Sequence, residues 1–176
     1  LGNNLIKSGN GNDTIYLKST ELWDNKFVAV HTITNETSTY ESINLQGYNK
    51  FSDHIFSGEG QDKIYLTAND DAFFLDDHYS ASNSSTYQES YNLGLAFGVL
   101  PRLINCEEIY GLAGSDLLDF TSAKITASKL LLNGGDGDDI LWAGAKNDVL
   151  IGGQGNDELN GGPGDDKITG GAGIDH

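Results

Sequence analysis

Aspartates recur at fixed intervals along the last quarter of the chain, where their carboxylates could bind a cation. Each stands at position six of a nine-residue frame, and glycine occupies most of positions one, two and four. Glycine permits tight turns in which backbone carbonyls come close together. Carboxylates and backbone carbonyls are the ligands of a hard cation, and roughly six to eight such oxygens suit Ca²⁺ better than Mg²⁺. The aspartates are Asp139, Asp148, Asp157, Asp166 and Asp175.

The residues that follow each aspartate predict the elements that position it. Position eight is Leu or Ile in every complete frame, which predicts a three-residue strand whose middle side chain points inward. Two frames make one coil, so that turns stack every eighteen residues and pairs of aspartates would share an ion. Without a cation the stacked carboxylates would repel each other. A flexible Gly/Asp-rich linker is the alternative, and the regular Leu/Ile positions argue against it. The expected pairs are Asp139 with Asp157, Asp148 with Asp166, and Asp157 with Asp175.

Composition excludes several classes of partner. The 176 residues include 26 acidic and 10 basic side chains, which give a formal net charge of -16. Such a charge argues against nucleic acid and against anionic membrane surfaces as partners. No apolar stretch is long enough for a transmembrane helix. The single cysteine, Cys106, allows no intrachain disulfide. The chain begins without a methionine or a signal-peptide pattern and stops within a frame, so we expect a fragment of a longer protein.

Residues 134–176 resemble the RTX (repeat-in-toxin) family of type I secreted bacterial proteins, whose nonapeptide G-G-x-G-x-D-x-U-x these frames follow. The resemblance implies an all-β fold, a right-handed parallel β-roll or β-helix that folds on binding several Ca²⁺ ions. It also implies a bacterial protein that is secreted or held on the cell surface, outside the cell. Frame 143–151 departs from the motif, because Ala143 and Lys146 replace glycines. The expected ligands besides the position-six aspartates are Gly134, Asp136, Gly152, Gln154, Gly161, Pro163, Gly170 and Ala172.

The same template returns upstream in degenerate form. Asp53 and Asp71 are eighteen residues apart, which is the spacing of one coil. Asp116 and Asp139 are 23 residues apart, so five extra residues must leave the roll near 121–132. We therefore expect a degenerate roll over 1–133 and a regular roll over 134–176, which together form one cooperative unit. The upstream aspartates expected to bind calcium are Asp13, Asp53, Asp62, Asp71 and Asp116.

Two long insertions interrupt the degenerate part, at about 17–47 and 75–105. The first contains KFVAVHTIT, whose alternation predicts a half-buried strand. The second is a long loop, and such loops are usually functional or disordered. Arg102, the only arginine, could bind a carboxylate of a ligand or form an ion pair with Glu107 or Glu108. The acidic pairs of this region could instead ligate calcium or lie in solvated turns. Candidate ligand-binding residues are Asp70, Asp76, Asp77, His78, Tyr79, Tyr87, Tyr91 and Arg102.

Two hypotheses about function follow from these features. The first, by resemblance to the C-terminal regions of RTX adhesins, is a monomeric cell-adhesion module of the kind used in biofilms. It would bind a peptide or a carbohydrate on another cell surface when calcium is present. The second is a calcium-triggered folding and secretion module of a toxin or hydrolase whose activity lies elsewhere. We expect no enzyme, because the H-E-x-x-H motif of zinc proteases and the G-x-S-x-G motif of serine hydrolases are absent.

Overall fold

The structure is a computed structural model that describes residues 5–19, 22, 28–31, 41–44, 46–51, 54–74, 103–121 and 127–176. Every regular element in these ranges is a β-strand, and all pairings between strands except that of β3 with β4 are parallel. The expected all-β fold with parallel sheets is therefore confirmed, whereas the right-handed sense of the roll stays a prediction. No helix in the described ranges is long and apolar enough to cross a membrane.

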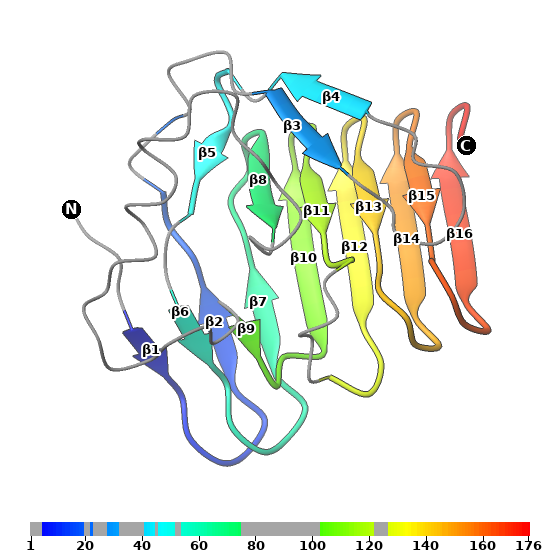
Figure 1. The fold of residues 1–176 in the computed structure, drawn as a ribbon. Helices are drawn as coiled ribbons and strands as arrows, with labels where there is room; N and C mark the ends of the chain where they lie inside the picture. Colours follow the sequence, from blue (N-terminus) through cyan, green and yellow to red (C-terminus); the bar gives the residue numbers. More distant parts are fainter. Residues whose placement is uncertain are drawn as a thin grey trace.

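Two parallel sheets form the two main faces of the roll (Figure 1). The large sheet has the strand order β16-β14-β12-β10-β7-β2, and the opposing sheet has the order β15-β13-β11-β8-β5. The strands of the large sheet are β2 (Thr14–Tyr16), β7 (Lys63–Tyr65), β10 (Glu108–Ala113), β12 (Leu131–Asp136), β14 (Val149–Gln154) and β16 (Lys167–Ala172). Those of the opposing sheet are β5 (Asn49–Lys50), β8 (Asp71–Phe74), β11 (Leu117–Asp119), β13 (Ile140–Trp142) and β15 (Glu158–Asn160).

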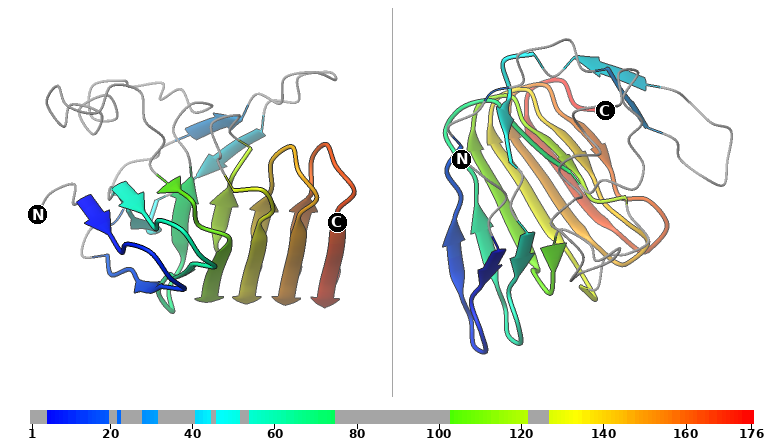
Figure 2. Two further views of the ribbon diagram at one scale, coloured as in Figure 1. Left: turned by 90° about the horizontal axis from the view of Figure 1, so that it is seen from below. Right: turned by 60° about the vertical axis from the view of Figure 1, so that its left-hand side comes forward.

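The N-terminal half carries two additional elements. A short three-stranded parallel sheet consists of β1 (Leu5–Lys7), β6 (His54–Phe56) and β9 (Leu103–Ile104). An antiparallel pair, β3 (Val28–His31) with β4 (Glu41–Asn44), lies outside the roll in both views of Figure 2. Strand β3 falls in the alternating segment of the first insertion, as its sequence predicts.

The regular coil contains eighteen residues, as the two-frame interpretation predicts. Leu132 of β12 is in register with Leu150 of β14, which is in register with Ile168 of β16. On the opposing sheet Leu141 is in register with Leu159. The five extra residues between Asp116 and Asp139 belong to the stretch between β11 and β12, and the strands on both sides keep their register.

Two expectations about the degenerate part are corrected. The second insertion ends before residue 103, because Leu103 and Ile104 pair with β6 and belong to the roll. The residue opposite Asp71 is Asn49 rather than Asp53, which lies outside the described residues. The reason is that this coil also contributes β6 to the short sheet, so that 22 residues separate Asn49 from Asp71 and the eighteen-residue spacing does not apply.

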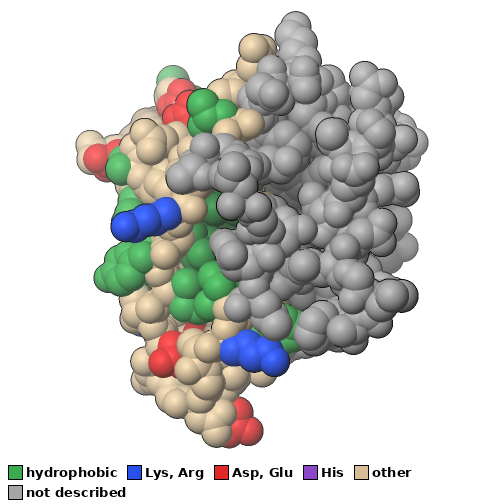
Figure 3. Space-filling view, turned by 90° about the vertical axis from the view of Figure 1, so that its left-hand side faces the viewer, with side chains coloured by type: hydrophobic (Ala, Val, Ile, Leu, Met, Phe, Trp, Pro, Cys, Tyr) green, Lys and Arg blue, Asp and Glu red, His purple; other side chains and the backbone are tan. Residues whose placement is uncertain are grey.

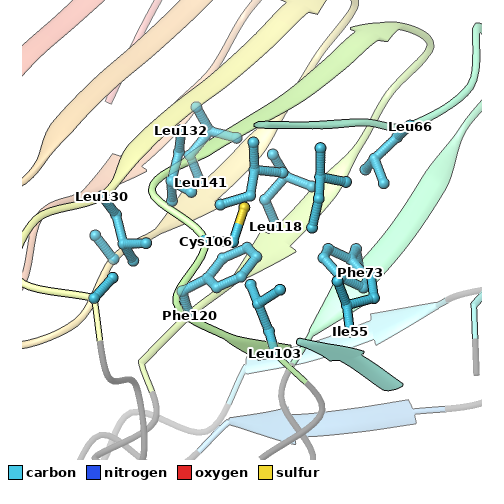
Figure 4. Packing of buried hydrophobic residues seen from close by; sticks show 14 of the residues in the cluster. Ile55, Leu66, Phe73, Leu103, Cys106, Leu118, Phe120, Leu130, Leu132 and Leu141 are labelled. Carbon is cyan, nitrogen blue, oxygen red and sulfur yellow. The ribbon is translucent and has the colours of Figure 1, made fainter. Parts of the chain in front are cut away.

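The core consists of the inward-facing side chains of successive strands (Figure 4). Position-eight residues of the large sheet and of the opposing sheet are at most 1 % exposed in the middle of the roll. Phe73 makes edge-to-face contacts with Phe51 and Phe120, at centroid distances of 6.0 and 5.7 Å. The last coil differs, since Ile168 is 49 % exposed. The fully buried members are Ile64, Ile109, Leu132 and Leu150 in one sheet and Phe73, Leu118 and Leu141 in the other.

Tyrosines at position nine stack on the outer face of the large sheet. The rings of Tyr16 and Tyr65 are 5.1 Å apart, and those of Tyr65 and Tyr110 are 4.7 Å apart. Beside them Lys63 Nζ contacts Glu108 Oε2 at 2.7 Å. Figure 3 shows hydrophobic side chains, with lysines at their margins, on the side of the molecule where the N-terminal coil lies. The tyrosine stack and the ion pair link the degenerate coils on their outer face.

The packing of the core predicts that shortening a side chain at the centre of the roll lowers the stability of the protein strongly. Leu118→Ala should lower the free energy of unfolding by about 2–5 kcal/mol, because the side chain is completely buried between two neighbouring strands. Urea unfolding at saturating calcium measures this change. Ile174→Ala is the control, since this side chain is 70 % exposed and its loss should cost less than about 0.5 kcal/mol. Equal costs for the two variants would contradict the packing described above.

Candidate metal centre

Position-six residues form two rows, one along each of the two sides of the roll where turns connect the two sheets. The first, here called the long row, precedes the strands of the opposing sheet. The second, here called the broken row, precedes the strands of the large sheet. The long row consists of Asp71, Asp116, Asp139, Asp157 and Asp175. The broken row consists of Asp13, Asp62, Glu107, Leu130, Asp148 and Asp166.

In the long row each carboxylate receives a hydrogen bond from the coil before it. The backbone N–H of Asp71 donates to Asp116 Oδ1 at 2.8 Å, and that of Asp116 donates to Asp139 Oδ1 at 2.8 Å. The N–H of Asp139 donates to Asp157 Oδ1 at 2.9 Å, and that of Asp157 to Asp175 Oδ1 at 3.2 Å. The predicted stacking of Asp139 on Asp157 and of Asp157 on Asp175 is thus confirmed, and the row extends further back than the sequence predicted.

The second oxygen of most of these carboxylates is buried without a hydrogen-bond partner. In the long row this holds for Oδ2 of Asp116, Asp139 and Asp157. A buried carboxylate oxygen without a donor is costly, and native proteins supply a donor, a water or an ion to such a group. The Oδ2 atoms therefore mark positions at which a cation fits. In the broken row the same holds for Asp13, Asp62 and Asp148.

Glycine backbones form the wall that these oxygens face. A Cβ added at Gly152 would overlap Asp157 Oδ2 and would lie 2.6 Å from the carbonyl oxygen of Gly170 in the next coil. A Cβ added at Gly134 would likewise overlap Asp139 Oδ2. The first glycine of the turn is thus needed because its backbone passes directly over the carboxylate. A carboxylate oxygen and a carbonyl oxygen of the neighbouring coil converge at this point.

Burial and neighbouring negative charges raise the pKa values of these carboxylates when no cation is bound. Burial raises the pKa of Asp116 to about 9, and the neighbouring carboxylates Asp139, Asp71 and Asp70 add to the shift. Burial also raises the pKa of Asp139 to about 7, with a further contribution from Asp157. The pKa values of Asp148 and Asp157 are raised for the same reasons. A bound cation would lower these pKa values, because an opposite charge favours the ionised carboxylate.

The donor set fits a calcium ion better than a transition metal. Within the described ranges no three side chains of His, Cys, Asp or Glu converge on one point, so a site in these turns must use backbone carbonyls. The carbonyls of Gln154 and Ala172 at position three each accept one backbone N–H, from Gly137 at 2.7 Å and Gly155 at 2.9 Å. A carbonyl oxygen has a second lone pair for an ion. Position-six carboxylates and the carbonyls of positions one and three would therefore hold Ca²⁺ between neighbouring turns.

The broken row has two stretches of stacked carboxylates separated by a gap. The N–H of Asp13 donates to Asp62 Oδ1 at 2.8 Å, and that of Asp148 donates to Asp166 Oδ1 at 2.8 Å, which confirms the predicted stacking of the latter pair. Between these pairs position six is Leu130, which has no carboxylate. The sequence analysis missed Glu107, whose Oε2 accepts the N–H of Asp62 at 2.9 Å. The sequence contained a signal for this position, because Ile109 stands two residues after Glu107, at position eight of the frame. Ile109 is in register with Ile64 of the preceding coil.

A second set of side chains links the turns in the opposite direction. Asp138 Oδ1 at position five accepts the N–H of Asn156 in the following coil at 2.7 Å. Asn156 Oδ1 accepts the N–H of Ile174 at 3.0 Å in the same way. Asp70, which the sequence analysis placed in a ligand site, has this structural contact too, since its Oδ1 accepts the N–H of Ser115 at 2.9 Å. Positions five and six together fix each turn to both of its neighbours.

The remaining candidate residues of the sequence analysis are not placed by the structure. Of the two acidic partners suggested for Arg102, Glu108 forms its ion pair with Lys63 and also accepts the hydroxyl of Tyr110 at 2.7 Å. Asp53 and the candidates within 75–102 lie outside the described residues. These candidates are Asp76, Asp77, His78, Tyr79, Tyr87, Tyr91 and Arg102.

Comparison with known proteins agrees with this geometry. A family model described as the RTX calcium-binding nonapeptide repeat (4 copies) matches residues 1–19, 49–77, 131–149 and 142–176. These ranges cover more than half of the chain and contain glycine turns of both rows, although not the turn 111–116 that precedes β11. No curated protein and no solved structure matches the chain.

The stacking predicts that removal of a carboxylate from the long row weakens calcium-dependent folding more than removal of an exposed carboxylate of equal charge. Asp157→Ala should raise the calcium concentration at the folding midpoint more than Asp175→Ala, because Asp157 has stacked neighbours on both sides. A calcium titration followed by circular dichroism measures the midpoint. Asp165→Ala is the matched control, since it removes the same charge from an exposed position next to the broken row. If all three variants shift the midpoint equally, net charge rather than stacking governs calcium binding.

The raised pKa values of Asp116 and Asp139 predict an unusual response of the calcium-free chain to pH. Their folded-state pKa values of about 9 and about 7 exceed the ordinary 3.8, so the folded chain holds protons that the unfolded chain has released. Stability is then greatest below the ordinary value and is lost as pH rises through the raised values. Calcium-depleted protein should show more β-sheet circular dichroism at about pH 5 than at about pH 8. At limiting calcium the order should reverse, because protons compete with the ion. A calcium-free chain that loses structure on acidification would contradict this.

Proposed function

Because the chain belongs to the family of proteins with RTX calcium-binding nonapeptide repeats, we propose that it is an extracellular adhesion module that folds on binding Ca²⁺. Once folded, it presents residues 75–102 to a peptide or carbohydrate on another cell surface. RTX proteins are typically secreted by bacteria, which agrees with a site of action outside the cell. The module has no catalytic role of its own in this proposal.

The observation that carries the calcium-dependent step is the row of buried carboxylate oxygens without donors. In a low-calcium compartment these groups must either remain charged and repel one another or take up protons against their ordinary pKa. Both alternatives disfavour the folded state near neutral pH. A ligand that binds only the folded state stabilises it by mass action. Extracellular calcium sites typically bind at about 10⁻⁴–10⁻³ M, so the chain would stay unfolded before export and fold afterwards.

The ligand-binding step is supported by how the ends of segment 75–102 are held. Strand β8 ends at Phe74, and it is paired on both sides, with β11 and with β5. Strand β9 begins at Leu103, which is 4 % exposed and pairs with β6. Both ends of the segment therefore start from strands of the roll. Binding residues often gather in segments that connect the strands of a rigid scaffold, and segment 75–102 contains the only arginine together with several tyrosines and acids.

A second candidate function is the folding and secretion module of a protein whose activity lies elsewhere. The observation that favours it is that repeat coils on both sides of segment 75–102 supply, within the described residues, the carboxylates of both rows. The roll could thus perform calcium-triggered folding with that segment absent. The two candidates agree about calcium and differ about ligand binding.

An experiment with a shortened segment distinguishes the two candidates. Residues 80–100 are replaced by a short Gly/Ser linker, and both proteins are tested against a glycan array and a displayed peptide library, in calcium and in EDTA. Circular dichroism serves as the folding control: EDTA should abolish most β-sheet signal in both proteins and millimolar Ca²⁺ should restore it, with Mg²⁺ much less effective. We expect the parent chain to bind on one panel in calcium only and the shortened chain to lose that binding.

Each part of the proposal has its own contrary outcome. Binding that is unchanged in the shortened chain would place the ligand site outside 80–100. Absence of binding on both panels by a calcium-folded parent chain would favour the folding and secretion module. Identical spectra in EDTA and in calcium would refute calcium-dependent folding itself.

A further inference from the structure

One aspartate of the long row has a different environment from the others. Asp71 is completely buried, as Asp116 and Asp139 are, yet neither of its oxygens lacks a partner. Its Oδ2 accepts the backbone N–H of Thr67 at 2.7 Å. Its Oδ1 accepts the Thr67 hydroxyl at 2.9 Å and the side-chain amide of Asn49 at 2.6 Å. The oxygen that faces an ion position in the later coils is thus occupied by a protein donor.

The donors around Asp71 form a closed network. Asn49 Nδ2 also lies 2.8 Å from Thr67 Oγ1, and the backbone N–H of Asn69 donates to the same oxygen at 3.2 Å. The backbone N–H of Asn49 donates to the carbonyl of Asp70 at 2.7 Å. Asn49 is itself 6 % exposed and stands opposite Asp71, where a regular coil has an aspartate. An amide donor at this place satisfies the carboxylate, whereas a second carboxylate would need a cation.

The turn before Asp71 also lacks the backbone path of the glycine turns. In the turn 134–139, Gly135 and Gly137 have φ values of 114° and 132°. The equivalent positions in the turn 66–71 are Thr67 and Asn69, and neither has a positive φ. The first position is Leu66, whose side chain is buried in the core. The carbonyls of this turn are therefore not arranged as they are in the glycine turns.

From these contacts we propose that a clasp of Thr67 and Asn49 holds Asp71 in place of Ca²⁺. The calcium-binding part of the long row then ends at Asp116. The junction between the turns 66–71 and 111–116 is made by hydrogen bonds alone, including that from the N–H of Asp71 to Asp116 Oδ1. This departs from the assignment of Asp71 as a calcium ligand in the sequence analysis.

The clasp has a structural consequence for the segment that follows. Strand β8 begins at Asp71 and ends at Phe74, immediately before segment 75–102. Besides the strand pairing of β8, Asp71 contacts both neighbouring coils, by its side chain on one side and its N–H on the other. The start of that segment is therefore anchored by protein donors, whatever ligand the segment binds.

Counting bound ions tests the clasp directly. Native mass spectrometry and equilibrium dialysis with Ca²⁺ alone are applied to the full chain and to three variants, Asp71→Asn, Thr67→Val and Asp139→Asn. We expect Asp71→Asn to bind the same number of ions as the parent chain and Asp139→Asn to bind fewer. Urea unfolding at saturating calcium should give a lower midpoint for Asp71→Asn, because an amide has one acceptor oxygen instead of two and its NH2 group would face one set of donors from Thr67 and Asn49.

The Thr67→Val variant keeps the test decisive if Asp71→Asn does not fold. It removes a hydroxyl donor, retains the side-chain shape and leaves both oxygens of Asp71 in place. We expect an unchanged number of bound ions and a lower urea midpoint. Loss of an ion in Asp71→Asn, or an unchanged urea midpoint in Thr67→Val, would overturn the proposal. Neither outcome depends on whether segment 75–102 binds a ligand, so failure here is distinguishable from failure of the adhesion proposal.

Discussion

A carboxylate with one satisfied and one unsatisfied oxygen, repeated in coil after coil, is the constraint on which the rest of this molecule depends. In Asp139 the first oxygen accepts the N–H of the preceding coil, and the second faces a glycine backbone without a donor. Parallel strands are about 4.8 Å apart, so the same group returns at that spacing along the row. Such closely spaced buried carboxylates cannot all be ionised unless cations lie between them. We therefore expect folding and calcium binding to be coupled.

The other features of the C-terminal coils serve this arrangement. A glycine at position one is required where its backbone passes over the carboxylate, as Gly152 does over Asp157. Side chains at position five, such as Asp138, hydrogen-bond in the direction opposite to those at position six, so that a turn cannot slip relative to either neighbour. Inward leucines and isoleucines reinforce the register, because a shift by one residue would expose them. Each coil contacts only its neighbours, as in other repeat proteins.

The N-terminal half reinforces the same register with further contacts. Stacked tyrosines, the ion pair of Lys63 with Glu108 and the donors around Asp71 act there in addition to the glycine turns and the carboxylates of Asp13 and Asp62. The broken row is interrupted later in the chain, at Leu130, which stands where an ion would need a carboxylate. Segment 75–102 follows strand β8, whose Asp71 is held by protein donors.

What the sequence by itself determined is the local period. Nine-residue frames predict three-residue strands, inward Leu141 and Leu150, and the stacking of Asp139 on Asp157, because eighteen residues of uninterrupted chain allow one register only. Tertiary structure alone decided the pairings across insertions. Asp13 lies against Asp62, which follows it by 49 residues in the sequence. Asn49 rather than Asp53 lies against Asp71. The length of an insertion does not constrain which strands meet, whereas backbone pairing and core packing do. Spacing therefore fails as a guide wherever the chain leaves the roll and returns.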